Sequence, residues 1–316
     1  DRADSRGRMH LVFVFVLVLA SISFAFALRL SALSAGLSDK EMSPRIAVVT
    51  GANKGIGYEI ARGLSLTPGI HVILTARKAA LGQDAADRLK QEGGQVSFHQ
   101  LDITDAQSIQ TLRSHIESQY GGLDILVNNA GFAFKMAATE PFSLQAKETL
   151  KINYFGTLAI SNALLPLIRA NGRIVNVASQ AGLISSLKSQ ALRDRFMADD
   201  LTEKQLSGLM KQFIDDAQSG QHQSRGWPST TYGVSKIGVA MLTRITARDI
   251  GRLNSNPGVL VNCYCPGWCK TDMAGWDRAP RTAAQGADTG IYLATLPPGS
   301  SDLNGHFFYD RAQRSW

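Results

Sequence analysis

The sequence predicts a doubly wound α/β fold, in which helices cover both faces of one parallel β-sheet. Short runs rich in β-branched residues alternate with helical segments along most of the chain. A glycine-rich turn at residues 50–57 (TGANKGIG) directly follows the first run, and polar side chains end several others. Crossover helices make such strands parallel, so ligands are expected beyond the carboxyl ends of the strands.

Seven short runs are predicted to form the strands. The first, residues 45–50, is mostly apolar and β-branched, as expected of a strand that is buried on both faces. The third, residues 95–99, alternates polar and apolar side chains. In chain order, the predicted strands are residues 45–50, 71–75, 95–99, 123–127, 173–177, 259–264 and 305–309.

The segments between the first five strands are predicted to be helices, because apolar residues recur there at helical spacing. Two of these segments stop at glycine pairs, at 93–94 and 121–122, and glycine commonly follows a helix end. A further helix is expected to carry Tyr232 and Lys236. The other predicted helices are residues 56–66, 79–92, 108–120 and 145–169.

Residues 186–225 interrupt this alternation with a polar, helix-prone stretch. Thr202 and Gln205 have the spacing of a capping box, in which two side chains satisfy backbone N–H groups at a helix start. An apolar stripe follows at helical spacing, formed by Leu206, Leu209, Met210 and Phe213. We interpret the stretch as a helical insert near the rim of the expected active site, so that residues 45–316 form a single domain.

Residues 1–44 are predicted to be a leader outside this domain. Residues 11–28 are almost wholly apolar, with two arginines and a histidine in front, which is typical of a signal peptide or signal anchor beginning at Met9. The apolar stretch is marginally long enough to span a bilayer. A Ser- and Ala-rich segment follows, so the expected destination is the secretory pathway or an algal plastid, whereas a start at Met42 would give a cytoplasmic protein. Membrane contact is expected only through this leader.

Composition excludes some classes of partner. The chain has 316 residues, of which 44% are hydrophobic and 19% charged, and a net charge of +7. No run of basic residues is interleaved with aromatic ones, so no nucleic-acid partner is expected. An anionic cofactor or substrate explains the mild positive balance.

Three cysteines, Cys263, Cys265 and Cys269, fall within one short segment. They cannot form a disulfide framework, and no fourth ligand is nearby to complete a zinc site, so no metal site is predicted. They are interpreted as small buried strand residues or, alternatively, as reactive thiols beside the active site.

The glycine-rich turn is predicted to bind a pyrophosphate. Gly51, Gly55 and Gly57 allow a tight turn that brings backbone N–H groups and a helix N-terminus close to an anion. An acid at the end of the second strand would bind the ribose 2′-OH of NAD, whereas an arginine binds the 2′-phosphate of NADP. Arg77 stands at this strand end and Lys54 lies inside the turn, with no acid at the strand end. The sequence therefore favours NADP(H).

Two further segments are expected beside this cofactor. Asp102 follows the third strand, where its carboxylate would hydrogen-bond the adenine ring. Residues 128–131 (NNAG) follow the fourth strand and are expected to line the adenine-ribose side of the cofactor and to steady the neighbouring strand.

Tyr232 and Lys236 form a candidate proton-transfer pair. They stand four residues apart on one helix, so their side chains lie on the same face. A nearby ammonium favours the phenolate, and we expect Lys236 to lower the pKa of Tyr232 from its usual value of about 10. Such a tyrosine can exchange a proton near neutral pH. Ser179 ends the fifth strand with a hydroxyl for a substrate carbonyl, and Asn153 is unusual inside a helix, which favours a functional role.

In combination these motifs resemble those of the short-chain dehydrogenases/reductases, and specifically the monomeric NADPH-dependent carbonyl reductases. The resemblance runs from about residue 45 to residue 316, and the insert before Tyr232 is a mark of that subgroup. Besides the glycine turn, the matching segments are residues 98–103 (FHQLDI), 122–135 (GLDILVNNAGFAFK), 164–168 (LLPLI), 226–236 (GWPSTTYGVSK) and 266–273 (PGWCKTDM). The resemblance implies a Rossmann fold, NADPH as cofactor, and reduction of aldehydes, ketones or quinones to alcohols.

The resemblance also implies a role for each site residue. Tyr232 would give its proton to the carbonyl oxygen, and Ser179 would hydrogen-bond the same oxygen as a small oxyanion hole. Lys236 would hold the nicotinamide ribose, and Asn153 would fix a water that connects Lys236 to solvent. The implied cofactor-binding residues are Gly51, Asn53, Lys54, Gly55, Ile56, Gly57, Arg77, Asp102, Ile103, Asn129, Ala130, Gly131, Tyr232, Lys236, Pro266, Gly267, Cys269, Lys270 and Thr271.

Small-molecule carbonyl compounds, including glutathione conjugates, are the partners that the resemblance implies. The implied substrate residues are Phe134, Lys135, Met136, Gln145 and Ser179. Cys265 matches a family cysteine close to that pocket. The insert is thought to block helix-mediated oligomerisation in the family, so the resemblance implies a monomer.

Two alternative functions remain open at this point. One is a specialised ketone reductase of secondary metabolism, such as the plant terpenoid and alkaloid reductases that share the insert. The other is a non-catalytic NADPH-binding module, although the presence of Tyr232, Lys236, Ser179 and Asn153 argues against it.

Overall fold

The computed structural model describes residues 43–316, apart from residues 136, 254–256 and 276–277. The predicted leader therefore lies outside the described residues, except for its last two positions, and so does Met136. Within the described part of the chain, no helix combines the length and the apolar character needed to cross a membrane.

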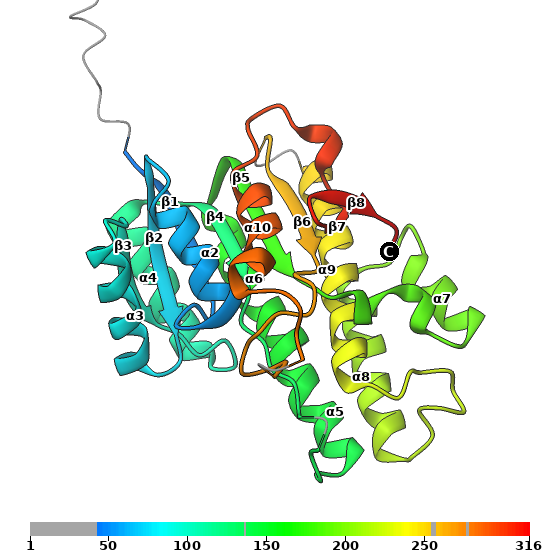
Figure 1. Cartoon of the computed structure of the whole chain (residues 1–316). Coiled ribbons are helices and arrows are strands. Elements are labelled where there is room, and N and C mark those ends of the chain that lie inside the picture. Colours follow the sequence, from blue (N-terminus) through cyan, green and yellow to red (C-terminus); the bar gives the residue numbers. More distant parts are fainter. Residues whose placement is uncertain (1–42, 136, 254–256, 276–277) are drawn as a thin grey trace, which may run out of the picture. The chain divides into compact units, whose positions relative to one another are not determined.

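An eight-stranded sheet forms the centre of the fold (Figure 1). Its strands are β1 Arg45–Val49, β2 Ile70–Ala76, β3 Val96–Gln100, β4 Leu123–Asn128, β5 Ile168–Val177, β6 Leu260–Tyr264, β7 Phe307–Tyr309 and β8 Ala312–Arg314. The strand order is β3-β2-β1-β4-β5-β6-β7-β8, and every neighbouring pair is parallel except β7 and β8. The predicted doubly wound α/β fold is confirmed, with one antiparallel strand added at its edge.

Helices cover both faces of this sheet. They are α2 Gly55–Ser65, α3 Ala79–Gln91, α4 Ala106–Tyr120, α5 Phe142–Leu150, α6 Thr157–Leu164, α7 Gln190–Met197, α8 Glu203–Gln218, α9 Thr231–Leu253 and α10 Ala283–Ala294. One core contains buried residues of α2, α3 and α10, and a second contains those of α4, α6 and α9. Ala47 and Val49 of β1 enter the first core while Ile46 and Val48 enter the second, as expected for a strand buried on both faces.

The order of the strands reverses beside β1, and this reversal places two loops next to each other. The chain adds β2 and β3 on one side of β1 and then returns to pair β4 with the other side. The loops after β1 and β4 therefore start side by side at the carboxyl edge of the sheet, where open α/β sheets bind ligands. These loops are the glycine-rich turn and the segment that begins at Asn129.

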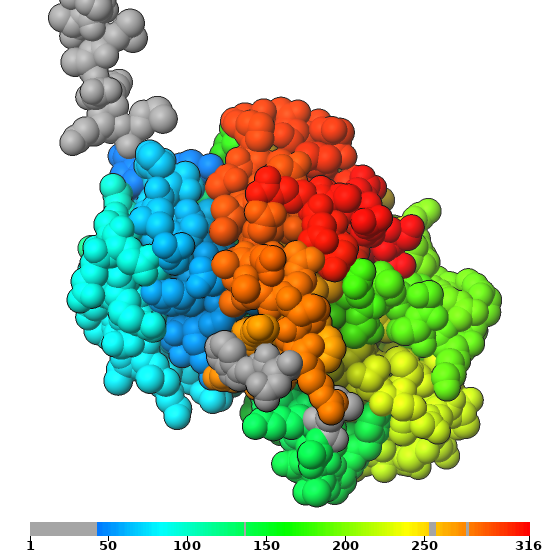
Figure 2. Space-filling view, in the orientation of Figure 1, coloured from blue at the N-terminus to red at the C-terminus, as the bar shows by residue number. Residues whose placement is uncertain are grey.

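The predicted insert contains α7 and α8. The predicted capping box is confirmed at the start of α8, because Gln205 N donates to Thr202 Oγ1 at 3.2 Å and Thr202 N donates to Gln205 Oε1 at 2.8 Å. The apolar stripe of α8 is buried in a third core with residues of α5 and α9. Figure 2 shows this yellow-green part beside the green α5, with the orange segment after β6 lying between the blue N-terminal part and the insert.

The helix predicted for residues 145–169 differs from the structure at both ends. It begins as α5 at Phe142, becomes a π-helix at Lys151–Gly156 and ends as α6 at Leu164. A 3₁₀ turn at Leu165–Leu167 contains Pro166, which cannot continue the α-helical hydrogen bonds. Ile168 then pairs with Leu123, so the chain has already entered β5.

The prediction omits α10 and β8 for identifiable reasons. Glycines at 286 and 290 lower the helix propensity of α10, yet a Cβ at Gly290 would lie 2.7 Å from Tyr264 Oη, so tight packing requires glycine there. The β7–β8 hairpin turns at Asp310 and Arg311, which have φ values of 50° and 58°. Two-residue hairpin turns of this type usually contain Asn-Gly, so the usual sequence signal is missing.

Candidate active site

The glycine-rich turn leads from β1 into α2 at the carboxyl edge of the sheet. Gly51 and Gly55 have positive φ values of 63° and 60°, a conformation that favours glycine. A Cβ added at Gly57 would lie 2.3 Å from Asn129 Nδ2, so a larger residue could not fit. No side chain caps the start of α2, and its free N–H groups and dipole therefore favour an anion at this turn.

Asn129 and Thr50 join this turn to the end of β4. Thr50 Oγ1 accepts hydrogen bonds from Asn129 N at 3.0 Å and Ala130 N at 2.9 Å. The Asn129 side chain donates to the backbone oxygens of Thr50 at 2.9 Å and Gly51 at 3.0 Å. The predicted residues of the two loops thus form one hydrogen-bonded unit.

The loop after β6 reaches the same turn. A Cβ added at Gly55 would lie 3.3 Å from Thr271 Cγ2. Lys54 Nζ lies 2.5 Å from Asp272 Oδ2, and both side chains are more than half exposed. The structure therefore brings Thr271, at the end of the predicted segment 266–271, to the glycine turn, and it adds an ion pair that the sequence did not suggest.

Three predicted cofactor residues, Arg77, Asp102 and Ile103, lie after β2 and β3. Arg77 is exposed after β2, and its guanidinium makes no hydrogen bond or ion pair with the described residues. Asp102 Oδ1 accepts hydrogen bonds from the backbone and side chain of Thr104, at 2.9 and 2.7 Å, and so stabilises the turn before α4. Ile103 is buried against Gly156, where an added Cβ would lie 2.9 Å from its side chain.

Helix α9 carries Tyr232 and Lys236 one turn apart. Lys236 is only 5% exposed, and its Nζ donates a hydrogen bond to Val177 O at 2.6 Å. The same Nζ lies 5.6 Å from the centroid of the Tyr232 ring. A Cβ added at Gly131 would lie 3.7 Å from this Nζ, so the segment after β4 also reaches the pair.

Ser179 lies next to Tyr232 because the turn after β5 packs tightly on α9. The Ser179 side chain lies close enough to the Tyr232 hydroxyl to lower its pKa, and Ser179 Oγ accepts a hydrogen bond from Ala181 N at 3.1 Å. A Cβ added at Gly182 would lie 2.5 Å from the carbonyl carbon of Lys236, and one added at Gly233 would lie 2.7 Å from a backbone oxygen of the turn. These two glycines permit the close approach that sets the separation between Ser179 and α9.

Burial dominates the pKa of both α9 side chains. It raises the pKa of Tyr232 to about 12; Cys265 adds to this rise, whereas the Ser179 side chain opposes it. Burial lowers the pKa of Lys236 to about 8. The pKa of Tyr232 therefore lies above its usual value, contrary to the prediction that Lys236 lowers it, because burial of the phenol dominates and Lys236 Nζ donates its hydrogen bond to Val177 O instead. Tyr232 keeps its proton at neutral pH.

Asn153 is fully buried in the π-helical turn Lys151–Gly156. Its Oδ1 accepts a hydrogen bond from Phe132 N at 2.7 Å, and its Nδ2 donates to Phe132 O at 2.8 Å and Ser235 Oγ at 2.9 Å. Ser235 Oγ donates in turn to Tyr232 O at 2.7 Å. Asn153 thus connects the segment after β4 to the helix that carries Tyr232, and π-helical turns are frequent at functional sites.

Besides Ser179, the described residues of the predicted substrate set lie in the segment after β4 and in α5. The Phe134 ring makes an edge contact with Phe132 at a centroid distance of 4.8 Å, and Lys135 is exposed. Gln145, in α5, donates a hydrogen bond to Glu140 O at 2.8 Å. The remaining member of this set of five, Met136, lies outside the described residues.

All three cysteines are buried and unpaired. Burial raises the pKa of the Cys263 and Cys269 thiols, which favours their neutral form. Among the residues that the structure describes, no group of three or more His, Cys, Asp or Glu side chains could hold a metal ion.

Several residues that shape the site are absent from the predicted set. They are Gly182, Gly233, Ser235, Trp268 and Asp272. Gly233 and Ser235 stand between the two predicted α9 residues, and this position is the signal that could have identified them. Trp268 is 50% exposed beside predicted loop residues, so it offers apolar surface at the site.

A cavity of about 380 Å³ lies elsewhere, between α4 and the helical segment 151–163. Its lining is mainly apolar and includes Ile103 but none of Asn153, Ser179, Tyr232 and Lys236. This cavity is therefore separate from the cluster of Asn153, Ser179, Tyr232 and Lys236.

Known proteins share this sequence pattern. Residues 45–191 match the family model described as short chain dehydrogenase. The chain is 47% identical over 273 residues to carbonyl reductase (NADPH) 1 of Pongo abelii. The aligned region covers 86% of this chain and 98% of that protein. The chain is 46% identical over 273 residues to carbonyl reductase (NADPH) 3 of Rattus norvegicus, with the same coverage.

Solved structures share the fold as well. Salutaridine reductase from Papaver somniferum matches with a TM-score of 0.75 and 34% identity, covering 84% of this chain and 99% of that chain. Menthone neomenthol reductase from Mentha piperita matches with a TM-score of 0.70 and 32% identity, covering 84% and 98%. By its sequence and its fold, the chain belongs to the short-chain dehydrogenase family.

Proposed function

We propose that this chain is an NADPH-dependent carbonyl reductase, which reduces aldehydes, ketones or quinones to alcohols. The observation that carries the proposal is the cluster of Asn153, Ser179, Tyr232 and Lys236 beside the glycine turn. The identity of 46–47% to proteins named carbonyl reductase (NADPH) supports the same reaction and the same cofactor for this chain.

The residues at the carboxyl edge of the sheet fit a dinucleotide. The turn allows backbone groups to approach a pyrophosphate closely, since Gly51 and Gly57 have no room for a Cβ. Lys54 and Arg77 would hold the 2′-phosphate, because both are exposed cations near this edge. The remaining cofactor contacts would come from Asp102, Ile103, residues 129–131 and the loop 266–271. When bound, NADPH supplies the hydride.

Tyr232 would deliver the proton to the carbonyl oxygen. Its raised pKa of about 12 means that it is protonated at neutral pH. The Ser179 hydroxyl is close enough to Tyr232 to affect its pKa, which supports a shared target for the two hydroxyls, so Ser179 would stabilise negative charge on the same oxygen. Lys236, whose pKa of about 8 leaves it mostly protonated at neutral pH, would stabilise the phenolate left by proton transfer. Asn153 would fix the water that connects Lys236 to solvent.

Substrate and oligomeric state are part of this proposal. Phe134, Lys135, Met136 and Gln145 would contact the substrate, and an exposed lysine among them suits the carboxylates of a glutathione conjugate.

The packing of α8 against α5 and α9 supports a monomer, because the insert covers helix surfaces that could otherwise pair between subunits.

The destination of the protein is a separate proposal. Residues 1–44 would direct it to the secretory pathway or to an algal plastid, unless translation starts at Met42. A fluorescent reporter fused to residues 9–44 tests this idea, and a fusion that stays in the cytosol would contradict it.

Turnover by the purified chain tests the proposed function. NADPH consumption should be measured with a panel of quinones, aldehydes and cyclic terpenoid ketones. We expect activity on several chemically different carbonyls. Activity on one terpenoid ketone alone would favour a specialised reductase, and NADPH binding without consumption of any carbonyl would favour a non-catalytic module.

A further inference from the structure

Arg281 joins the loop after β6 to the rest of the protein through its backbone. Lys270 N donates a hydrogen bond to Arg281 O at 2.8 Å, and Arg281 N donates to Trp268 O at 3.2 Å. These two bonds form a parallel bridge between Cys269 and Arg281. The middle of the loop is therefore attached to the segment that leads into α10.

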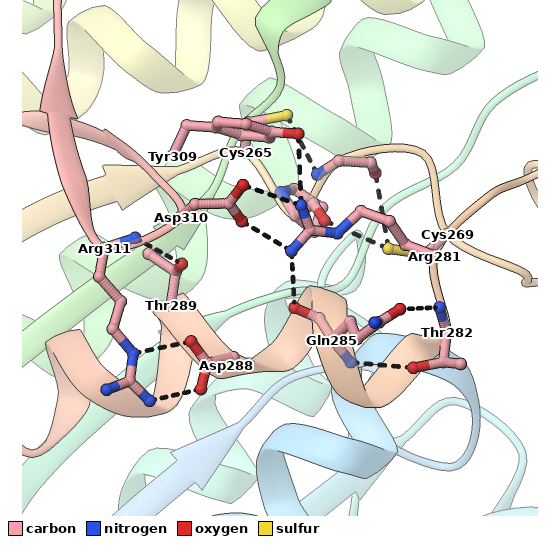
Figure 3. A network of polar contacts seen from close by, with 12 residues as sticks. Cys265, Cys269, Arg281, Thr282, Gln285, Asp288, Thr289, Tyr309, Asp310 and Arg311 are labelled. Atoms are coloured by element: carbon pink, nitrogen blue, oxygen red, sulfur yellow. Dashed lines mark hydrogen bonds and ion pairs between the residues drawn. The ribbon is translucent and has the colours of Figure 1, made fainter.

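The side chain of Arg281 reinforces this attachment. A Cβ added at Gly267 would lie 2.7 Å from Arg281 Cδ, so the arginine stem lies directly against the loop. Its guanidinium binds both carboxylate oxygens of Asp310, at 2.6 and 3.1 Å, and donates to Tyr309 Oη at 3.3 Å and Gln285 O at 3.2 Å. Figure 3 shows the guanidinium between the hairpin tip and the start of α10. A two-point arginine–carboxylate pair fixes orientation as well as distance.

The hairpin tip is a firm anchor, although its backbone is strained. Asp310 and Arg311 both have positive φ values without being glycine. Arg311 binds both oxygens of Asp288 in α10, and its backbone N donates to Thr289 Oγ1 at 3.0 Å. Helix α10 itself packs on α2, since a Cβ added at Gly63 would collide with Ile291. The hairpin is thus tied to α10, which in turn packs on α2, the helix that begins at the glycine turn.

Two ion pairs at the hairpin tip therefore have different consequences. Arg311–Asp288 ties the tip to α10, and neither side chain makes a hydrogen bond or ion pair with the described residues of the loop. Arg281–Asp310 ties the same tip to the loop, because the arginine belongs to the bridge with Cys269. The hydrogen bond from Arg281 lowers the pKa of Asp310, so the carboxylate remains charged at neutral pH.

We infer that Arg281 is a positioning residue for cofactor binding. It holds the loop 266–271 in the position in which Thr271 contacts the glycine turn. The inference rests on the proposed function, since the contact of this loop with NADPH belongs to that proposal. Loss of Arg281 would leave the glycine turn and the cluster of Asn153, Ser179, Tyr232 and Lys236 in place but release the loop. A displacement of about 1 Å in a binding or catalytic group can cost on the order of 10²-fold in rate.

The test compares variants of the two ion pairs in the full chain. Arg281→Ala and Asp310→Asn should each raise the NADPH dissociation constant about tenfold, measured by NADPH fluorescence, and lower kcat, with KM for the carbonyl substrate nearly unchanged. The double variant should be no worse than Arg281→Ala alone, because both changes break one link. Arg281→Lys should restore part of the affinity. Arg311→Ala is the matched control, which should lower Tm but leave NADPH affinity within about twofold.

The outcomes separate this inference from the proposed function. Equal losses of NADPH affinity in Arg281→Ala and Arg311→Ala would overturn the inference, because Arg281 would then be only structural. Unchanged affinity in Arg281→Ala and Asp310→Asn, with normal binding by the unmodified chain, would also overturn it. If Arg281→Ala does not fold, Asp310→Asn and Arg281→Lys decide the matter. Failure of the unmodified chain to bind NADPH would instead overturn the proposed function itself.

Discussion

A single added methyl group at Gly182 should move Ser179 away from α9, the helix that carries Tyr232 and Lys236. In Gly182→Ala the new Cβ would lie 2.5 Å from the carbonyl carbon of Lys236 and 2.7 Å from Ile237 N. Both are backbone atoms of α9, which cannot rotate away, whereas ordinary contact begins at about 3.4 Å. The turn that carries Ser179 must therefore move outward by about 1 Å, and a misplacement of that size can cost about 10²-fold in rate. That factor corresponds to about 2.7 kcal/mol of transition-state stabilisation.

The assay is kcat/KM for a quinone at saturating NADPH, together with the NADPH dissociation constant. Gly251→Ala is the matched control, since Gly251 lies in α9, the helix against which Gly182 packs, and an added Cβ there would have no atom of the described residues within 4 Å. The control should keep full activity and gain about 1 kcal/mol of stability, because alanine favours the helix. Gly182→Ala should lose activity while NADPH affinity stays nearly constant. Activity within threefold of the unmodified protein would refute the argument that this contact positions Ser179.

Three further predictions concern stability, pH and cofactor choice. Arg173 is 1% exposed and donates to backbone oxygens that include Gly258, Leu296 and Pro297, so Arg173→Met should lower the free energy of unfolding by about 2–4 kcal/mol in urea titrations. A loss below about 0.5 kcal/mol would contradict this. Lys236 has a pKa of about 8 and is a cation below it, so kcat should fall as pH rises from 7 to 9.5; a flat profile would argue against a role for its charge. Arg77→Ala should raise KM for NADPH about tenfold and leave KM for NADH unchanged, whereas equal changes for both would disprove the 2′-phosphate contact.

The sequence predicted the parallel part of the fold because its signals are local. A continuous apolar run such as residues 45–50 and a glycine-rich turn directly after it specify a buried strand and the start of a helix. The capping box at Thr202 and Gln205 is equally local, and it forms as predicted. The hairpin at Asp310 and Arg311 depends instead on ion pairs with residues that are distant in the sequence, so no local sequence signal predicts it.

The candidate site shows the same division. The pair Tyr232 and Lys236 follows from spacing on one helix. The pKa of Tyr232 cannot be predicted from this spacing. It depends on how deeply the ring is buried and on where Lys236 Nζ points, and both depend on packing between α9 and β5. Likewise, the tight fit of Gly182 on α9 becomes visible only when the turn after Ser179 is seen against the helix.

Tyr232→Phe tests the central claim most directly. The substitution removes the proton donor and leaves the ring in place, so single-turnover oxidation of NADPH by a quinone or ketone should slow by about 10²–10⁴-fold. NADPH affinity, measured on the same samples by fluorescence, should remain within about threefold of the unmodified protein. Turnover within tenfold of the unmodified rate would contradict the assignment of Tyr232 as the proton donor.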